Sequence, residues 1–142
     1  SGISNATAIS SGRFHTCVLL SDNTLTCWGM NDHGQLGDGT NTQRNTPVSV
    51  SGIDNATAIS SGLIHTCALL SDNTLKCWGN NEGGQSTPPR DLGPVLAAFA
   101  GKYLTCAIQM DQSVKCWGNA DYGKSTPPDD LKVYIPEEKE EL

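Results

Sequence analysis

The side chains in this sequence that could form crosslinks, bind metal or act as nucleophiles are concentrated in a short pattern that occurs three times. Its cysteines form three pairs, each with its members ten positions apart: Cys17 and Cys27, Cys67 and Cys77, and Cys106 and Cys116. His15 and His65 stand two positions before the first cysteine of their pairs, whereas Leu104 occupies this position in the third copy. Cysteine pairs of this kind either form disulfides or, together with the histidines, coordinate a metal ion.

The spacing of the cysteines favours disulfides. An even number of cysteines at a repeated spacing is typical of a disulfide framework in an oxidising compartment. Structural zinc sites usually draw their cysteines from close pairs such as C-x-x-C, which this sequence lacks, and the third copy has no histidine. We therefore predict three disulfides, no metal, no cofactor, and a secreted or cell-surface location.

The remaining polar groups form no recognisable catalytic or ion-binding motif. The sequence has no serine in a nucleophile elbow and no H-E-x-x-H motif, and its cysteines are expected to be paired. Asp22 and Asp72 lie at expected turns, where solvated carboxylates commonly support the turn itself. The loop with Asp32, Asp38 and Asn41 lacks the ligand spacing of an EF-hand. The sequence therefore predicts a protein that is not an enzyme.

The segments that position the cysteines are repeated along the chain. Residues 1–29 and 51–79 differ at only five positions, which indicates an internal duplication. The spacing from Cys17 to Cys67 is 50 residues and from Cys67 to Cys106 it is 39, because the second connector after Trp-Gly is shorter. A recurring unit of this length is the signature of a repeat architecture. We divide the chain into repeat 1 (residues 1–50), repeat 2 (51–93), repeat 3 (94–131) and an acidic C-terminal tail (132–142).

Each cysteine pair is predicted to link the two strands of a β-hairpin. If Asp22 is the centre of a tight turn, Ser-Asp-Asn supplies a turn-forming loop and Cys17 faces Cys27 across the antiparallel pair. Directly opposed residues have Cα atoms about 4.5–5.5 Å apart, which is within disulfide range. The same count works around Asp72 and Asp111, so every repeat is expected to contain one crosslinked hairpin.

Short strands are predicted on both sides of this hairpin. The segments NATAISSG before it and NTPVSV after it read as strands, which gives about four strands per repeat and no helical periodicity. Both faces of the hairpin carry apolar residues, so each small sheet must be covered on both sides. Radial repetition of four-stranded sheets meets this requirement. The predicted fold is all-β, with three blade-like four-stranded antiparallel repeats that form a partial or oligomer-completed β-propeller.

The repeated sequence also resembles a known family. The run from Ala58 to Asn80, with Gly34 to Gly39 and Pro47 to Val50 in the first connector, is similar to the regulator of chromosome condensation repeat. The resemblance covers residues 1–131 and implies propeller blades, of which such rings typically have about seven. The cysteine pairs resemble those of secreted or surface-exposed members rather than the nuclear exchange factor. Three repeats imply a fragment, an open arc or half of a ring completed by a second copy.

The turns just before the hairpins are the candidate binding site. They read Gly-x-x-His in the first two repeats and Gly-Lys-Tyr-Leu in the third, and their two central residues vary while the neighbouring sequence repeats. Loops on a rigid scaffold commonly carry binding specificity. The competing interpretation, which we favour, is that the apolar members pack between blades and the histidines hydrogen-bond to backbone. The candidate ligand-binding residues are Arg13, Phe14, His15, Leu63, Ile64, His65, Lys102 and Tyr103.

The tryptophans and two glycosylation motifs have weaker functional implications. Trp28, Trp78 and Trp117 could stack on sugars, but their recurrence beside a cysteine favours packing between blades. Asn5 and Asn55 satisfy the N-x-Ser/Thr pattern and are candidate glycosylation sites if the protein passes through a eukaryotic secretory pathway.

Charge and composition narrow the classes of partner. The net charge is −6 and the nine lysines and arginines are not clustered, so we expect no nucleic-acid partner. No apolar run approaches the roughly 20 residues of a membrane span, so we expect no membrane insertion.

Together these features predict an extracellular binding module that recognises a protein or a carbohydrate through loops of a disulfide-linked, propeller-type scaffold. The first alternative is a structural subunit of an extracellular filament, appendage or matrix. The second is a fragment of a larger propeller protein. Self-association, to complete the ring or to polymerise, is also expected.

Overall fold

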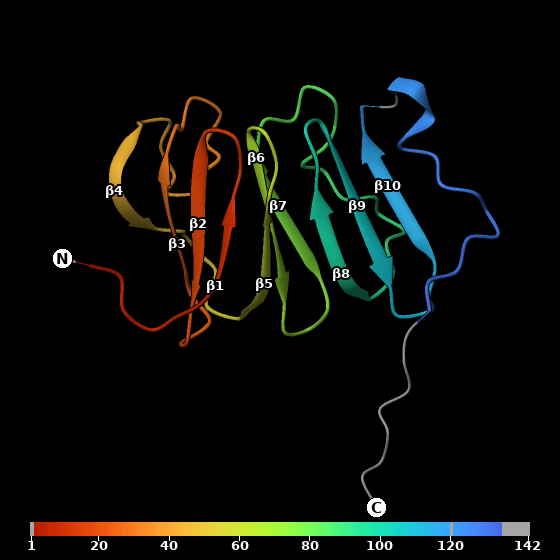
Figure 1. The fold of residues 1–142 in the computed structure, drawn as a ribbon, viewed down its shortest axis with the longest axis horizontal. Coiled ribbons are helices and arrows are strands. Elements are labelled where there is room, and N and C mark those ends of the chain that lie inside the picture. Colours follow the sequence, from red (N-terminus) through yellow and green to blue (C-terminus); the bar gives the residue numbers. More distant parts are fainter. Residues whose placement is uncertain (1, 120, 135–142) are drawn as a thin grey trace, which may run out of the picture.

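The computed structural model describes residues 2–119 and 121–134, which form β-strands joined by turns (Figure 1). The strands are β1 (Ala6–Ser11), β2 (His15–Leu20), β3 (Leu25–Gly29), β4 (Arg44–Ser49), β5 (Ala56–Ser61), β6 (His65–Leu70), β7 (Leu75–Gly79), β8 (Val95–Ala100), β9 (Leu104–Gln109) and β10 (Val114–Gly118). A short 3-10 helix, η1 (Asp121–Gly123), follows β10. No helix in these ranges is long and apolar enough to cross a bilayer. Most of the predicted acidic tail, residues 135–142, lies outside the described residues.

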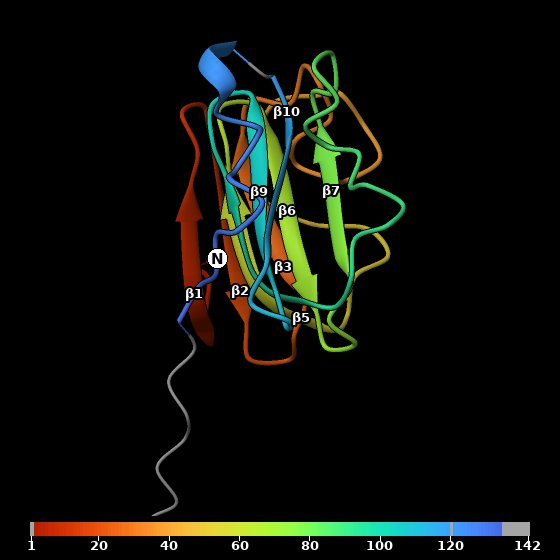
Figure 2. The ribbon, with the colours of Figure 1, turned by 90° about the vertical axis from the view of Figure 1, so that its right-hand side faces the viewer.

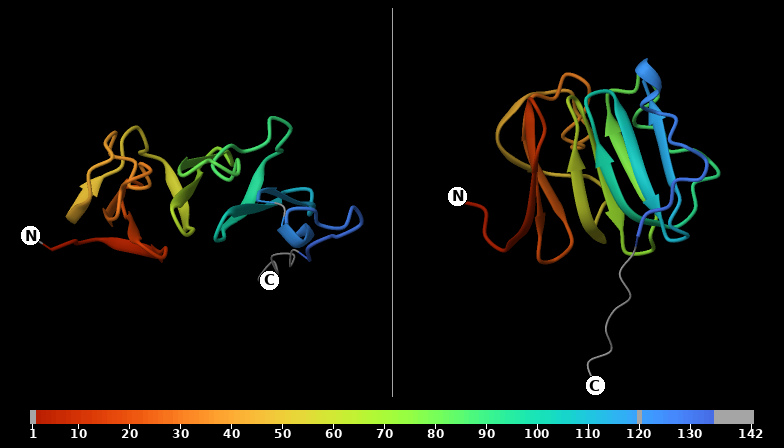
Figure 3. Two further views of the ribbon diagram at one scale, coloured as in Figure 1. Left: turned by 90° about the horizontal axis from the view of Figure 1, so that it is seen from above. Right: turned by 45° about the vertical axis from the view of Figure 1, so that its right-hand side comes forward.

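The strands form three antiparallel sheets, one per repeat, in which each strand pairs with the next along the chain. Their orders are β1-β2-β3-β4, β5-β6-β7 and β8-β9-β10, and we call them blades 1, 2 and 3. The blades stand side by side in an open array (Figures 1 and 3), in which β4 and β10 lie at the two ends and β1, β5 and β8 lie between them. The all-β, propeller-type fold predicted from the sequence is confirmed.

The central hairpins have the predicted register. Cys17 lies opposite Cys27, and the same pairing recurs in blades 2 and 3. Asp22 supports the first turn, because its Oδ1 accepts a hydrogen bond from Thr24 N at 3.1 Å. Asn23 has a φ of 64°, a left-handed conformation that asparagine tolerates better than most residues. The turn sequence therefore sets the alignment that brings each cysteine pair together.

Three disulfides join the pairs that the sequence predicts. Their Cα–Cα distances are 4.1 Å for Cys17–Cys27, 4.1 Å for Cys67–Cys77 and 4.0 Å for Cys106–Cys116. The chain has no free cysteine.

The predicted fourth strand is present only in repeat 1, where β4 pairs with the outer edge of β3. Blades 2 and 3 have three strands within the part of the chain that the structure describes. Their connectors are shorter and contain Pro88–Pro89 and Pro127–Pro128 respectively. Proline has no N–H, so each pair removes two adjacent donors, whereas β4 contains the single Pro47.

The core lies between the blades. At the first junction the cysteine-bearing face of blade 1, with Leu19 and Leu25, packs against Ala68 and Leu70 of blade 2. At the second junction Cys67 and its neighbours in blade 2 pack against Ala107 and Trp117 of blade 3. Blade 2 is therefore covered on both faces, as the pattern of apolar residues predicts, whereas blades 1 and 3 each have one covered face.

Candidate functional site

Three turns of the same backbone design lie along one edge of the array. They join β1 to β2, β5 to β6 and β8 to β9, and all three are at the top of Figure 1, close to where the connectors leave β3, β7 and β10. In each turn the glycine N–H donates to a carbonyl three residues later, at 2.9, 2.9 and 2.8 Å from Gly12, Gly62 and Gly101. We call this edge, defined by turn residues 13–14, 63–64 and 102–103, the variable edge.

The glycines of the first two turns are required by the close approach of neighbouring blades. A Cβ atom on Gly12 would collide with the carbonyl oxygen of Gly62, and one on Gly62 would collide with that of Gly101. A Cβ on Gly101 would meet the flexible side chain of Leu104 at 3.0 Å and would make only an ordinary contact with the Leu104 carbonyl oxygen at 3.5 Å. These turns therefore hold adjacent blades together in addition to presenting their central residues.

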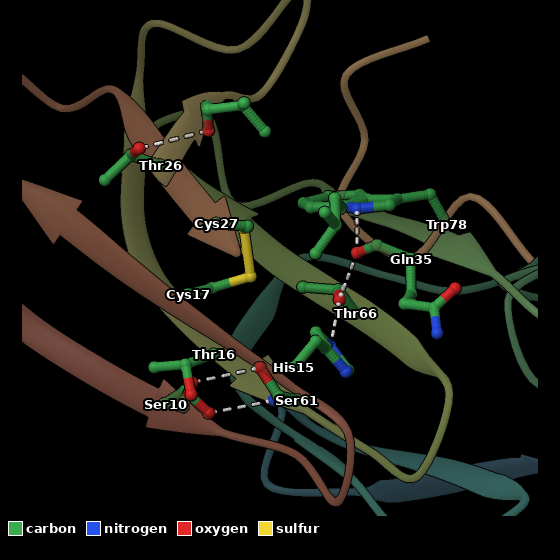
Figure 4. Close-up of a disulfide and its surroundings, with 12 residues drawn as sticks. Ser10, His15, Thr16, Cys17, Thr26, Cys27, Gln35, Ser61, Thr66 and Trp78 are labelled. Carbon is green, nitrogen blue, oxygen red and sulfur yellow. Dashed lines mark hydrogen bonds between the residues drawn. A yellow bond between two sulfur atoms is a disulfide. The ribbon is translucent and has the colours of Figure 1, made fainter. Parts of the chain in front are cut away.

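His15 and His65 begin hydrogen-bonded chains that cross the junctions between blades. The Nε2 atom of His15 lies 2.8 Å from Thr66 Oγ1 in the next blade (Figure 4). Because Thr66 Oγ1 donates its proton to the carbonyl oxygen of Gln35 at 2.8 Å, His15 Nε2–H must be the donor of the first bond. Trp78 Nε1 donates to the same carbonyl oxygen at 3.0 Å. We call this arrangement the inter-blade relay.

The second junction repeats the relay with equivalent residues. His65 Nε2 lies 2.9 Å from Thr105 Oγ1, and Thr105 Oγ1 donates to the carbonyl oxygen of Gln85 at 2.8 Å. Trp117 Nε1 donates to that oxygen at 3.1 Å. Trp78 and Trp117 thus lie at the junctions, as predicted, whereas the equivalent Trp28 is half-buried on the uncovered face of blade 1.

Burial keeps both relay histidines neutral. Removal from water lowers the pKa of His15 to about 4, and it lowers that of His65 to about 4 with a smaller effect from His15. The Nδ1 atoms are buried and have no hydrogen-bond partner among the described residues. These two candidate binding residues are therefore buried and hydrogen-bonded across the junctions between blades, and the other six lie at or near the surface.

The exposed members of the variable edge form two cation–aromatic pairs. The guanidinium of Arg13 lies over the ring of Phe14 with its carbon 5.1 Å from the ring centre, and Lys102 Nζ lies 5.3 Å from the centre of the Tyr103 ring. The corresponding residues of blade 2, Leu63 and Ile64, are half-buried and apolar. The edge thus presents two positive, aromatic ends separated by an apolar centre, an arrangement suited to an acidic segment with apolar side chains.

A polar hollow beside Tyr103 belongs to the same edge and escaped prediction from the sequence. Its volume is about 320 Å³, and it is lined by Asn80, Glu82, Gln85 and Asn119 among others. Tyr103 is the only one of the predicted binding residues in this lining. Asn80, Glu82, Gln85 and Asn119 lie in the connectors that follow β7 and β10. Their position two to seven residues after a tryptophan of the repeat is the signal by which the sequence could have identified them.

The acidic connector of repeat 1 is held by internal hydrogen bonds. Burial opposes ionisation of Asp38, but hydrogen bonds from Thr40, Arg44 and Asn31 outweigh it and lower its pKa to about 2. Asp38 Oδ2 pairs with Arg44 Nε at 2.9 Å. Across residues 2–119 and 121–134, no group of three or more His, Cys, Asp or Glu side chains is arranged to hold a metal ion.

The two glycosylation motifs occupy equivalent turns but differ in accessibility. Asn5 is exposed just before β1, whereas Asn55 is half-buried and its Nδ2 donates to Ser71 Oγ at 3.3 Å. Modification at either residue stays a prediction, with Asn5 the more accessible of the two.

The sequence matches a known repeat. The family model of the Regulator of chromosome condensation (RCC1) repeat matches residues 6–35 and 56–85, and a second model of the same repeat matches residues 22–69. Together these matches cover residues 6–85, more than half of the chain. No curated protein matches the sequence.

Solved structures show the same architecture. Prp20p from Saccharomyces cerevisiae is 20% identical with a TM-score of 0.79, over 92% of this chain and 37% of that one. The ectodomain of the Arabidopsis thaliana receptor kinase ACR4 is 27% identical with a TM-score of 0.60, over 80% of this chain and 37% of that one. The Physcomitrella patens receptor kinase CR4 ectodomain is 28% identical with a TM-score of 0.59, over 80% and 28%. The chain thus spans about a third of these proteins, and it belongs to the Regulator of chromosome condensation (RCC1) repeat family.

Proposed function

We propose that the chain is a protein-binding module of an oxidising compartment, secreted or at the cell surface, and that it recognises its partner through the variable edge. The observation that carries this proposal is the pair of cation–aromatic contacts, Arg13 with Phe14 and Lys102 with Tyr103, in turns whose backbone is otherwise repeated. Arginine and aromatic residues are enriched at protein interfaces. Binding, rather than catalysis, is the proposed activity.

The structural relatives support protein recognition as a use of this scaffold. Prp20p is described with binding to Gsp1p and histones, and also in a complex with Kap60. ACR4 and CR4 are receptor kinases, and the matching parts are their ectodomains. Pairing of all six cysteines in disulfides supports an oxidising compartment for this chain as well.

Selection from a displayed random-peptide library tests the proposal. The immobilised chain is expected to enrich acidic peptides with apolar side chains, and a variant with alanine at Arg13, Phe14, Lys102 and Tyr103 should lose this enrichment while its thermal unfolding is unchanged. Asn45→Ala, an exposed change on β4, is the matched control. Enrichment of the same peptides by the folded fourfold variant would contradict recognition through the variable edge, whereas failure of the variant to fold would assign these positions to packing.

Carbohydrate is the second ligand class, and the polar hollow beside Tyr103 supports it. Probing a glycan array with the wild-type chain and the fourfold variant separates the two classes. Glycan binding that disappears in the variant, without any peptide enrichment, would replace protein by carbohydrate as the proposed ligand.

Self-association is the second part of the proposal, and the uncovered faces of blades 1 and 3 support it. Ile9 lies opposite Val18 on the free face of blade 1 and is 68% exposed, while Phe99 lies opposite Cys106 on the free face of blade 3 and is 58% exposed. Faces of these two kinds pack against each other at both junctions within the chain. A second copy can therefore cover them head to tail.

Sedimentation velocity over a range of concentrations, with negative-stain microscopy, tests self-association. Two copies that close a six-bladed ring would sediment as a discrete dimer, which supports the binding module. Long polymers would favour the structural subunit of a filament, appendage or matrix. A monomer at every concentration would contradict self-association and favour the remaining alternative, three blades from a larger propeller.

A further inference from the structure

The outer edge of β7 lacks the strand that covers the equivalent edge in blade 1. In blade 1, β4 runs along Leu25–Cys27 of β3: Thr26 lies opposite Ser49, Cys27 lies opposite Val48, and Val50 N donates to Leu25 O at 2.9 Å. Residues 75–77 of β7 are the counterparts of residues 25–27. Within the described part of the chain β7 pairs with β6 alone, so the backbone groups on its other side have no strand partner.

A cavity of about 430 Å³ lies along this edge of β7. Its lining includes four consecutive residues, 75–78, and successive side chains of a strand point to opposite faces, so the cavity follows the edge rather than one face. Val50 and Ile53 from the segment before β5 form its apolar opposite wall, and Pro88 of the connector also contributes. The space is therefore bordered by unpaired backbone on one side and by apolar side chains on the other.

A similar cavity lies along β10, but there the lysine of the strand forms an ion pair. It measures about 400 Å³ there and is lined by Val114, Lys115 and Cys116, the counterparts of β7 residues 75–77. Lys115 Nζ forms an ion pair with Asp91 Oδ2 at 2.7 Å and also donates to the Asp91 carbonyl oxygen at 2.8 Å. Lys76, its counterpart on β7, is exposed and forms no ion pair with the described residues. An internal carboxylate thus already pairs with the lysine of β10, whereas Lys76 of β7 has no such partner among the described residues.

We infer that the β7 edge binds an extended peptide as a fourth strand of blade 2. Blade 1 supplies the template, because its own fourth strand shows what pairs with this backbone. The peptide places a β-branched apolar residue at the position of Val48, opposite Cys77, and an acidic residue at the position of Ser49, opposite Lys76. Main-chain hydrogen bonds supply affinity in this mode of recognition, and alternate side chains supply specificity.

This surface is separate from the variable edge. None of the turn residues 13–14, 63–64 and 102–103 lines the cavity along β7. Figure 2 shows β7 on the side opposite β1. The inference goes beyond the proposed function, and its test is independent of which partner the variable edge binds.

A synthetic peptide with the sequence of β4 provides the probe. It contains residues 43–51 with Ser49→Glu and carries a fluorophore for anisotropy. Saturable binding is expected, together with slower amide hydrogen exchange at β7 (Leu75–Gly79). Protection confined to β3 would mean that the peptide only displaces β4, and protection at β10 or an absence of saturable binding would equally overturn the inference.

Charge reversal on the strand tests the predicted register. Lys76→Glu should weaken binding of the acidic peptide by about threefold to tenfold, because one exposed ion pair is replaced by repulsion. A peptide with Ser49→Lys should regain that loss on the Lys76→Glu variant, whereas Lys124→Glu, an exposed change just after η1, should leave binding unchanged. An equal response to both protein variants, or no rescue by the lysine peptide, would overturn the inference.

Discussion

Blades 1 and 2 contain almost the same peptide in two different settings. Residues 1–29 and 51–79 differ at only five positions, and their hairpins share one register. Ala6 is nevertheless exposed, whereas its counterpart Ala56 is fully buried, because blade 2 lies between two neighbours. The comparison separates two levels of structure: the local sequence determines the hairpin, and the adjacent blades determine burial and hydrogen-bond partners.

The inter-blade relay shows how adjacent blades determine hydrogen-bond partners. Thr66 receives a hydrogen bond from His15 of the preceding blade, while among the described residues Thr16 only approaches Ser11 Oγ at 3.4 Å. At the other end, Leu104 replaces the histidine, so blade 3 has no imidazole with which to begin another relay. The same threonine position is therefore a junction residue in one blade and a surface residue in the other.

Acid should break the junctions and produce the largest loss of stability. His15 and His65 have a folded-state pKa of about 4, below the unfolded value of 6.5, so folding favours their neutral form. Their contribution is complete above pH 6.5 and is lost as the pH falls toward 4, by up to about 3 kcal/mol for each histidine. Urea denaturation at intervals between pH 7 and 4.5 measures this slope.

A matched variant assigns the slope to the relay. His65→Leu reproduces the residue that repeat 3 already has at this position and should remove about half of the pH dependence. The carboxylates that the hairpin turns hold at lowered pKa, such as Asp22 and Asp72, titrate below this window and leave the slope unaffected. An unchanged slope in His65→Leu would show that the buried histidines are not its source.

Substitution of the turn glycines should distinguish a tight contact between blades from a loose one. Gly62→Ala places a Cβ against the Gly101 carbonyl oxygen, a backbone atom that cannot yield locally, and should cost about 2–3 kcal/mol. Gly101→Ala meets no close atom but the flexible side chain of Leu104 and should cost less than about 1 kcal/mol. Equal midpoints in chemical denaturation would contradict the close approach of blades 2 and 3.

Removal of one hydroxyl group compares the two threonines directly. Thr66→Val leaves the His15 Nε2–H donor and one acceptor interaction of the Gln35 carbonyl unmatched in a buried junction, which should cost about 2 kcal/mol. Thr16→Val removes a hydroxyl from the uncovered face and should change stability by less than about 0.5 kcal/mol. Differential scanning calorimetry of the two variants measures the difference, and equal losses would place both threonines in similar environments.

The sequence predicts the features that depend on local geometry. Counting outward from Asp22 gives the register that aligns Cys17 with Cys27, because a tight turn fixes which residues face each other. The alternation of side chains along each strand then predicts that both faces of the hairpin carry apolar residues. The number of strands in repeats 2 and 3 does not follow from such counting, because the path of a proline-containing connector depends on what it packs against.

The hydrogen-bond partners across the junctions between blades also cannot be predicted from a local sequence pattern. The indole of Trp78 donates to the carbonyl of Gln35, 43 positions earlier, and no periodicity links the two. One signal was present: Thr16, Thr66 and Thr105 recur directly before a cysteine, even in the copy that lacks the histidine. That pattern is explained for Thr66 and Thr105, each of which accepts a hydrogen bond from the histidine of the preceding blade.

The smallest expected effect concerns the isoleucines Ile9 and Ile59, which occupy the same strand position. Ile59 packs against the first junction, so Ile59→Ala should cost about 1 kcal/mol, whereas Ile9 is 68% exposed and Ile9→Ala should change stability by less than about 0.5 kcal/mol at low protein concentration. If a second copy covers blade 1, Ile9→Ala should instead weaken self-association in sedimentation velocity, while Ile59→Ala leaves it unchanged. Equal effects of both changes on stability would mean that the free face of blade 1 is already covered in the monomer, and the distinction between the two blades would then fail.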